Sequence, residues 1–126
     1  MQTTFPCAVP EIPVTDMAAA LEYYKERLGF NIDWGGGESD ISGVSRGHCR
    51  LFLTDPSFRG SRHSWVAVTW LNLNSKAEVD DQHREWHARG AKITSTPDSK
   101  PWKLYEFCVA DLDENVFRVF YDFSRG

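Results

Sequence analysis

The first pattern in the chain is an apolar stripe with helical spacing. Its members, separated by four, three and four positions, are Met17, Leu21, Tyr24 and Leu28. This spacing places them on one face of a helix, with charged residues on the outer face. A side-chain oxygen of Thr15 or Asp16 can accept a free backbone N–H at the start of this helix. Gly29 predicts its end in a left-handed residue.

Four runs around this helix have the composition of strands. They cover residues 8–14, 30–34, 41–46 and 49–54, and the last two are joined by a turn at Gly47-His48. Pro10 and Pro13 interrupt the first run, which predicts either an edge strand or an arm exchanged with a second copy. Residues 55–62, rich in Pro, Ser, Gly and Arg, are predicted to link this half of the chain to the next.

The second half repeats this order. Residues 64–73 predict a long strand, and Asn74 or Ser75 can cap a helix over about 76–89. Three further strands are expected at 91–94, 102–110 and 116–123, with a loop over 95–101 and a turn over 111–115. Gly29 and Gly90 occupy matching positions in the two halves, each between a helix and a strand. The chain therefore predicts the order β-α-β-β-β twice.

This order implies an α+β fold in which two βαβββ modules form a curved mixed sheet with a concave cavity and helices outside. A four-stranded sheet with one helix buries one face and leaves the other open, which is a usual geometry for a small-molecule site. We expect a single domain over residues 1–126, with module one at about 1–58 and module two at about 63–126. The cavity can be completed within the chain or across a dimer, and the Pro-containing arm favours a homodimer.

Composition narrows the possible partners. The net charge of −4 disfavours a phosphate backbone, so no nucleic-acid partner is expected. No apolar run reaches the roughly 20 residues of a membrane helix, and the first residues do not resemble a signal peptide. Three distant Cys residues fit a reducing compartment, and we expect a cytoplasmic protein without membrane association. An aromatic content of 13% indicates flat apolar binding surfaces in addition to a core.

Several motifs resemble those of one family. They are Ala8-Val9-Pro10, Asp16-Met17, Ala20-Leu21-Glu22-Tyr23-Tyr24, Arg27-Leu28-Gly29-Phe30, Leu51-Phe52-Leu53, Trp65-Val66-Ala67-Val68, Lys100-Pro101-Trp102, Glu106-Phe107 and Asp111-Leu112-Asp113-Glu114-Asn115. The chain resembles the vicinal oxygen chelate superfamily, which includes glyoxalase I, extradiol dioxygenases, fosfomycin resistance enzymes and bleomycin-binding resistance proteins. The bleomycin resistance proteins are the closest likeness, although their Asp-Pro-x-Gly-Asn turn is present here without its Pro and Gly.

The resemblance implies where a divalent metal would be held in the metal-dependent members, which use His and Glu from the middle of four strands. The corresponding positions fall near Val9, near Phe52, at Trp70 or Leu71, and near Arg118. None of these residues is a metal ligand, and a cationic side chain would repel the ion. We therefore expect no metal and no cofactor. A shift of register by one or two residues would bring in Glu11 and Glu106 as carboxylates.

The remaining His and Cys residues have ordinary structural interpretations. His83 and His87 stand one helical turn apart but are interpreted as surface residues, because the sequence between them lacks the zinc-protease pattern. His48 lies in a hairpin turn and His63 in the linker. Cys49 and Cys108 are expected to be small core residues. No pair of nucleophile and base can be recognised, so no catalytic residue is predicted.

The resemblance also implies a ligand crevice at a dimer interface, with aromatic rings stacked on the ligand. The implied crevice residues are Trp34, Trp65, Trp102, Asp33, Ile41 and Thr54. Tryptophan suits this role because it offers a large rigid face that also attracts cations. Trp70 and Trp86 are assigned to packing. Arg118 either faces the cavity, where it would favour an anionic or carbonyl-bearing ligand, or forms a salt bridge to Glu11 or Glu106.

Three functions remain open from the sequence. The leading hypothesis is a metal-independent binding protein, similar to bleomycin resistance proteins, that sequesters a flat aromatic or glycopeptide antibiotic in a homodimer crevice. The alternative is a vicinal oxygen chelate enzyme, a metal-dependent lyase or dioxygenase with an unknown substrate. The third is a binding domain whose ligand is unrelated to antibiotics.

Overall fold

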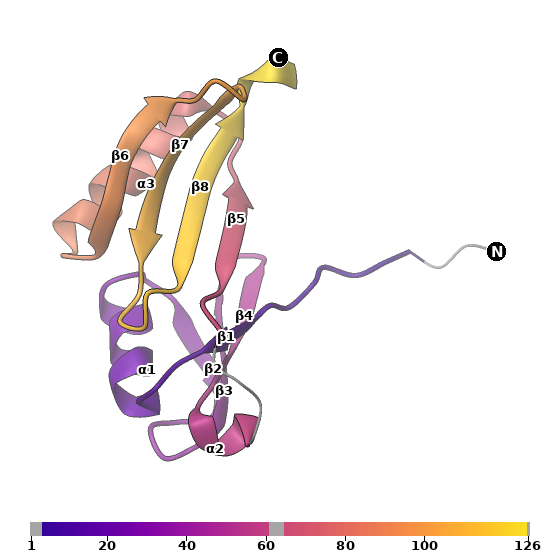
Figure 1. The fold of residues 1–126 in the computed structure, drawn as a ribbon, viewed down its shortest axis with the longest axis vertical. Helices are drawn as coiled ribbons and strands as arrows, with labels where there is room; N and C mark the ends of the chain where they lie inside the picture. Colours follow the sequence, from indigo (N-terminus) through magenta and orange to yellow (C-terminus); the bar gives the residue numbers. More distant parts are fainter. Residues whose placement is uncertain (1–3, 61–64, 126) are drawn as a thin grey trace.

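The first half of the chain folds as one helix packed on a four-stranded sheet. The structure is a computed structural model and describes residues 4–60 and 65–125. The elements of this half are β1 (Glu11–Pro13), α1 (Met17–Glu26), β2 (Asn31–Trp34), β3 (Ile41–Arg46), β4 (Cys49–Thr54) and α2 (Pro56–Arg59). The strand order is β1-β4-β3-β2, with β1 parallel to β4 and the other pairs antiparallel (Figure 1).

The second half repeats this topology. It contains β5 (Val68–Asn72), α3 (Lys76–Ala88), β6 (Lys92–Ser99), β7 (Leu104–Ala110), β8 (Val116–Asp122) and the short 3-10 helix η1 (Phe123–Arg125). The strand order β5-β8-β7-β6 corresponds to that of the first sheet, with β5 parallel to β8. The predicted α+β fold with two βαβββ modules is confirmed.

The predicted helix boundaries follow from caps that the structure contains. The carboxylate of Asp16 accepts a hydrogen bond from the backbone N–H of Ala19, and the hydroxyl of Ser75 accepts one from Glu78. These bonds satisfy amide groups that the first helical turn leaves without partners. Gly29 and Gly90 follow the two helices with φ of +76° and +80°, as expected for residues that end a helix in the left-handed region.

The two modules share one hydrophobic core. Tyr24 on α1 contacts Phe30 of its own module and Phe117 of the other, with ring centroids 5.7 Å and 6.1 Å away and rings close to perpendicular. Trp86 on α3 is buried, and its indole N–H donates to the carbonyl of Leu28 across the junction. Residues far apart in sequence therefore fix how the modules pack.

A buried carboxylate in the β7–β8 turn also ties the modules together. Asp111 accepts hydrogen bonds from the hydroxyl of Tyr24 and the side-chain amide of Asn115. Burial raises the pKa of Asp111 and outweighs the opposite effect of these bonds. Burial and the neighbouring Asp111 also raise the pKa of Tyr24 well above its usual value. The same Asn115 amide donates to the carbonyl of Pro13 at the end of β1.

The structure differs from the expectations at three places. The predicted loop over 95–101 continues β6 as far as Ser99, as an edge strand with two register shifts, one of which spans Pro97. The predicted linker contains α2, which Asp55 caps by accepting from the N–H of Phe58. The first and fifth strands are shorter than predicted. His63 and the predicted start of the fifth strand at residue 64 lie outside the described residues.

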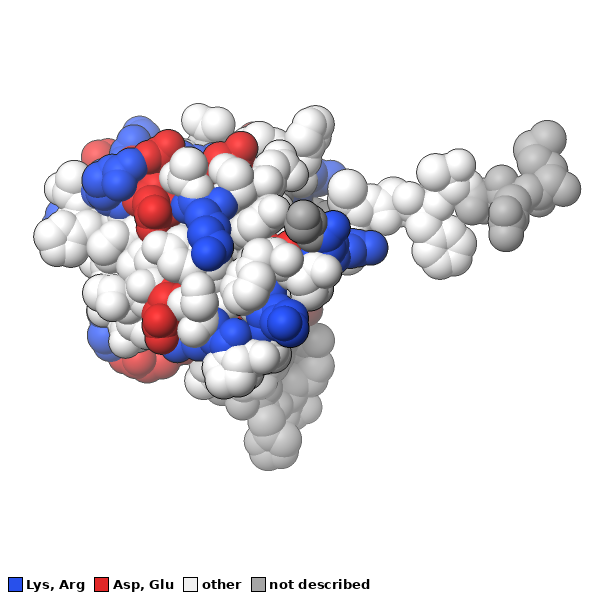
Figure 2. Space-filling view, turned by 90° about the horizontal axis from the view of Figure 1, so that it is seen from above, with Lys and Arg blue, Asp and Glu red and all other residues white. Residues whose placement is uncertain are grey.

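The surface carries charges of both signs, and the N-terminal arm extends away from it. Lys and Arg side chains are interspersed with Asp and Glu on the face seen in Figure 2. The arm that precedes β1 leaves the body as an extended segment, and Phe5 on it is 88% exposed (Figure 1). No helix among the described residues is long and apolar enough to cross a membrane.

Candidate functional site: two aromatic concave faces

Each sheet has one face covered by a helix and one concave face that carries large side chains. Because side chains alternate along a strand, the neighbours of buried core residues point to the open face. In module one this face, which we call concave face one, is formed by Glu11, Trp34, Gly43, Arg50 and Phe52. In module two, concave face two is formed by Trp70, Trp102, Glu106, Arg118 and Phe120.

Trp34 dominates concave face one. Its ring packs edge-on against Phe52, with centroids 5.2 Å apart, and it lies directly over Gly43. A Cβ atom at position 43 would come within 2.4 Å of the indole Nε1, so only glycine leaves room for the ring. Arg50 lies over the other aromatic ring, with its guanidinium carbon 5.7 Å from the Phe52 centroid. Trp34 remains 41% exposed and presents an apolar surface to solvent.

The polar residues predicted near Trp34 have different environments. The carboxylate of Asp33 is exposed and accepts a hydrogen bond from the hydroxyl of Ser45. Thr54 is fully buried, and its hydroxyl donates to the carboxylate of Glu11 at 3.0 Å. Thr54 thus positions Glu11 rather than offering surface of its own. Ile41 is half-buried and lies opposite Thr54 in the ladder between β3 and β4.

Concave face two is organised by a buried carboxylate. Glu106 on β7 is only 1% exposed, and both of its oxygens accept hydrogen bonds. The indole N–H of Trp102 donates to Oε1 at 2.7 Å, and Nε of Arg118 donates to Oε2 at 2.9 Å. The guanidinium carbon of Arg118 lies 4.6 Å from the ring centroid of Trp70. The salt bridge from Arg118 to Glu106 is one of the two that the sequence allowed.

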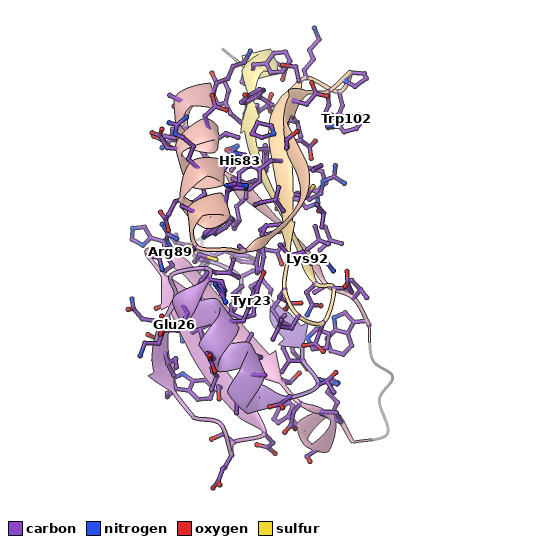
Figure 3. The ribbon with its side chains drawn as sticks, turned by 90° about the vertical axis from the view of Figure 1, so that its left-hand side faces the viewer. Tyr23, Glu26, His83, Arg89, Lys92 and Trp102 are labelled. Carbon is purple, nitrogen blue, oxygen red and sulfur yellow. The ribbon has the colours of Figure 1, made fainter. Side chains whose placement is uncertain are left out.

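The other tryptophans separate into surface and core residues. Trp102 lies on the side of its sheet away from α3 and is 54% exposed (Figure 3). Trp70 is 48% exposed and belongs to concave face two, so its assignment to packing is wrong. Trp86 is buried, as predicted. Trp65 lies apart from the concave faces, beside Val14 and the guanidinium of Arg59, in a small hollow of about 250 Å³.

A cleft between the modules reaches Trp70. This cleft has a volume of about 750 Å³, within the range of small-molecule sites. Its lining includes the apolar Leu71 and Trp86 and the polar His48 and Arg50. Cys49 also lines it, and burial raises the pKa of this thiol, which favours the protonated form over a nucleophilic thiolate.

The histidines of α3 do not face this cleft. His87 is exposed, but His83 lies between α3 and the sheet, with its ring centroid 5.3 Å from that of Phe107 (Figure 3). The predicted surface position holds for His87, whereas His83 is only partly exposed. Burial and the neighbouring His87 lower the pKa of His83, so the neutral form predominates at neutral pH.

The residues at the centre of the four inner strands do not fit a divalent metal. Glu11 lies opposite Phe52 between β1 and β4, and Trp70 lies opposite Arg118 between β5 and β8. The resemblance implied positions near Val9, near Phe52, at Trp70 or Leu71 and near Arg118, and in the structure Glu11, rather than Val9, is the β1 residue paired with Phe52. One carboxylate with two aromatic rings and a guanidinium cannot form a coordination shell. Among the described residues, no three His, Cys, Asp or Glu side chains group in a way that could hold a metal ion.

The two modules, their strand order and their open aromatic faces agree with a family comparison. The family model described as the Glyoxalase/Bleomycin resistance protein/Dioxygenase superfamily matches residues 7–119. The chain belongs to this superfamily. No curated protein sequence matches the chain significantly.

Several solved structures share the fold. A lactoylglutathione lyase from Agrobacterium tumefaciens superposes with a TM-score of 0.76 at 18% identity, covering 95% of this chain and 96% of that chain. A glyoxalase/bleomycin resistance protein/dioxygenase from Nocardioides gives 0.75 at 18% identity, covering 95% and 85%. TioX from Micromonospora sp. ML1 gives 0.69 at 17% identity, covering 91% and 94%. At these identities the likeness concerns the fold alone.

Two features of the site were missed by sequence reasoning. Trp70 is followed directly by the apolar Leu71, so alternation of polar and apolar residues does not show which of the two side chains faces out. The hydrogen bond between Trp102 and Glu106 joins residues only four apart, on either side of the turn into β7. The sequence signal for this bond was Glu106 itself, a carboxylate in the middle of a strand. Such a residue needs hydrogen-bond partners when it is buried.

Proposed function

We propose that this chain is a metal-independent binding protein that sequesters a flat aromatic compound, including glycopeptide antibiotics of the bleomycin type. The observation that carries this proposal is the set of half-exposed tryptophans on the two concave faces: Trp34, Trp70 and Trp102. Large apolar rings held at a concave surface are typical of small-molecule sites and rare on surfaces without a binding role. We expect it to act in the reducing cytoplasm, since its three cysteines are free.

The charges of concave face one are compatible with the cationic tail of an aromatic ligand. Glu106 compensates Arg118, so concave face two does not present an uncompensated cation. The exposed carboxylate of Asp33 lies on the strand that carries Trp34 and can meet a cationic tail. Aromatic faces also attract cations directly. These features support the bleomycin-like proposal and a contribution of Asp33 to the site.

A homodimer is part of this proposal. The two helices cover their sheets from different sides, so each concave face opens separately to solvent (Figure 1). A second copy can supply the opposite wall of the crevice. The extended N-terminal arm with its exposed Phe5 also offers apolar surface to a partner. We expect sedimentation at micromolar concentration to give twice the chain mass of 14.4 kDa, and a species of 14.4 kDa alone would contradict the dimer.

Calorimetric titration with bleomycin, both copper-free and copper-bound, tests the proposed ligand class. We expect saturable binding that weakens when Trp34 or Trp102 is replaced by Ala. Leu112→Ala is the matched control, because Leu112 is an exposed apolar residue in the β7–β8 turn, outside the concave faces. Trp65→Ala shows whether that position contributes as well. Equal binding by all variants would contradict a site on the concave faces.

The enzyme alternative has a direct test in the same preparation. A lyase or dioxygenase of this superfamily would need a divalent ion, and the central residues of the four inner strands do not fit one. A stoichiometric ion that survives dialysis would overturn the binding-protein proposal and favour the enzyme. If bleomycin gives no heat of binding but other aromatic compounds bind, the chain is a binding protein whose ligand is not an antibiotic.

A further inference from the structure

The hydrogen-bond network of concave face two holds two ligand-facing side chains in fixed positions. Glu106 accepts from the indole of Trp102 through one oxygen and from Arg118 through the other. Nη2 of Arg118 also lies 2.7 Å from Oε2. A buried carboxylate is stable only when it is paired and hydrogen-bonded. Trp102 and Arg118 are therefore both anchored to the same carboxylate.

The guanidinium of Arg118 offers one donor to a ligand. Its side chain is 30% exposed and is stacked on Trp70, which fixes the plane of the group. Nε and Nη2 are directed to Glu106, and no described residue accepts a hydrogen bond from Nη1. An arginine fork held in this way loses little entropy when it binds an acceptor. The concave face thus presents an oriented N–H donor next to flat aromatic surfaces.

The charge of the network selects the kind of acceptor. Glu106 is almost fully buried directly beneath Arg118, so the pair carries no net charge. A ligand carboxylate would lose its hydration without meeting a net positive charge, and its desolvation costs far more than that of a neutral carbonyl. A neutral carbonyl oxygen can accept from Nη1 at small cost. The network therefore favours an uncharged acceptor.

We propose that concave face two recognises a flat, uncharged aromatic carbonyl compound, such as an aryl amide, lactam or quinone. The carbonyl oxygen accepts from Nη1 of Arg118, and the ring stacks on Trp102. This inference rests on the proposed binding function, and it names the chemical group that concave face two binds. It also gives a role to the guanidinium that occupies one of the four central strand positions, where metal-dependent relatives would need a ligand.

Three probes with one ring system and different charges test this inference: 2-naphthamide, 2-naphthoate and 2-naphthylmethylammonium. Binding is followed by NMR through the indole N–H signals, assigned from Trp→Phe variants. We expect the wild type to bind the amide about tenfold more tightly than either ion, the size of one lost hydrogen bond plus desolvation. Preference for 2-naphthoate, or for 2-naphthylmethylammonium, would overturn the inference.

Variants of the network provide the second arm. Arg118→Met should weaken amide binding about tenfold. The double variant Glu106→Gln/Arg118→Met should show the same loss without leaving a buried charge, so the test holds even if the single variant does not fold. Arg84→Met, which removes an exposed arginine on α3, is the control and should bind like the wild type. Unchanged amide binding in the double variant would refute a role for Arg118.

The single change Glu106→Gln makes the sharpest distinction. It keeps the shape of the side chain but leaves Arg118 positively charged, so selectivity should reverse and 2-naphthoate should bind better than 2-naphthamide. Selectivity that does not reverse would contradict the role assigned to charge compensation. Equal binding of all three probes, lost in Trp102→Ala, would refute this inference and leave the proposed function standing. Binding of none of them would count against both.

Discussion

Replacing Trp102 separates a ligand-binding residue from a structural one. Its ring is 54% exposed, so truncation to Ala leaves little dry cavity. The change removes the hydrogen bond to Glu106, but Glu106 keeps Arg118 as a partner and water can replace the indole N–H. We expect the free energy of unfolding to fall by about 1 kcal/mol. Loss of a stacking surface should weaken binding of an aromatic ligand by about 1–3 kcal/mol, or about 5- to 150-fold.

A conservative variant and a core variant make this measurement interpretable. Trp102→Phe removes the N–H but keeps an aromatic face, so it should lose the same stability as Trp102→Ala and retain most of the affinity. Trp86→Ala removes a buried ring and should cost about 3–5 kcal/mol of stability. Urea unfolding and calorimetric titration are carried out on each protein. A large loss of stability in Trp102→Ala with unchanged affinity would show that Trp102 is a packing residue, contrary to our assignment.

Three further changes test the surrounding structure. Gly43→Ala should displace the Trp34 ring and destabilise the fold by about 1–3 kcal/mol, because the new Cβ would overlap the indole; an unshifted Trp34 indole N–H signal would contradict this. Tyr24→Phe removes the buried hydroxyl that donates to Asp111 and should cost about 1.5–3 kcal/mol in urea unfolding; a neutral result would mean that this bond does not hold the modules together. Hydrogen bonding to an arginine lowers the pKa of Glu85 below its ordinary 4.5, so its stabilisation is present above that pH and is lost as the pH falls further. Glu85→Gln should therefore flatten the acid side of the stability profile, and identical acid profiles would refute the assignment.

Sequence patterns predicted most elements because local and tertiary preferences agree there. The strands β3 and β4 alternate around a two-residue turn and have the expected bounds, Ile41–Arg46 and Cys49–Thr54. The strand β6 was only partly predicted, because residues 95–99 lack apolar alternation. Its outer part forms through pairing with β7, as in the pair Asp98 and Glu106. Tertiary pairing at a sheet edge therefore determined what local composition did not.

The candidate site was predictable only as far as alternation identifies a face. Trp34 and Trp102 stand next to glycines or a proline, where a buried ring is unusual, and both are half-exposed. Trp70 and Leu71 are consecutive apolar residues, so alternation does not decide between them, and Leu71 is the one that packs against the core. The sequence left two possible salt-bridge partners for Arg118, Glu11 and Glu106. The register between β7 and β8 brings Glu106 to the guanidinium. Contacts between strands depend on their register, and the register cannot be deduced from a single sequence.

The central claim is that an aromatic ligand binds without a metal. It is tested most directly by dialysing the protein against a chelator, measuring its metal content by mass spectrometry, and titrating the same sample with copper-free bleomycin and with 2-naphthamide. We predict saturable binding of at least one of these compounds by metal-free protein, with an affinity that added Zn²⁺ or Ni²⁺ does not change. An ion retained in stoichiometric amount, or binding that appears only after an ion is added, would contradict the account.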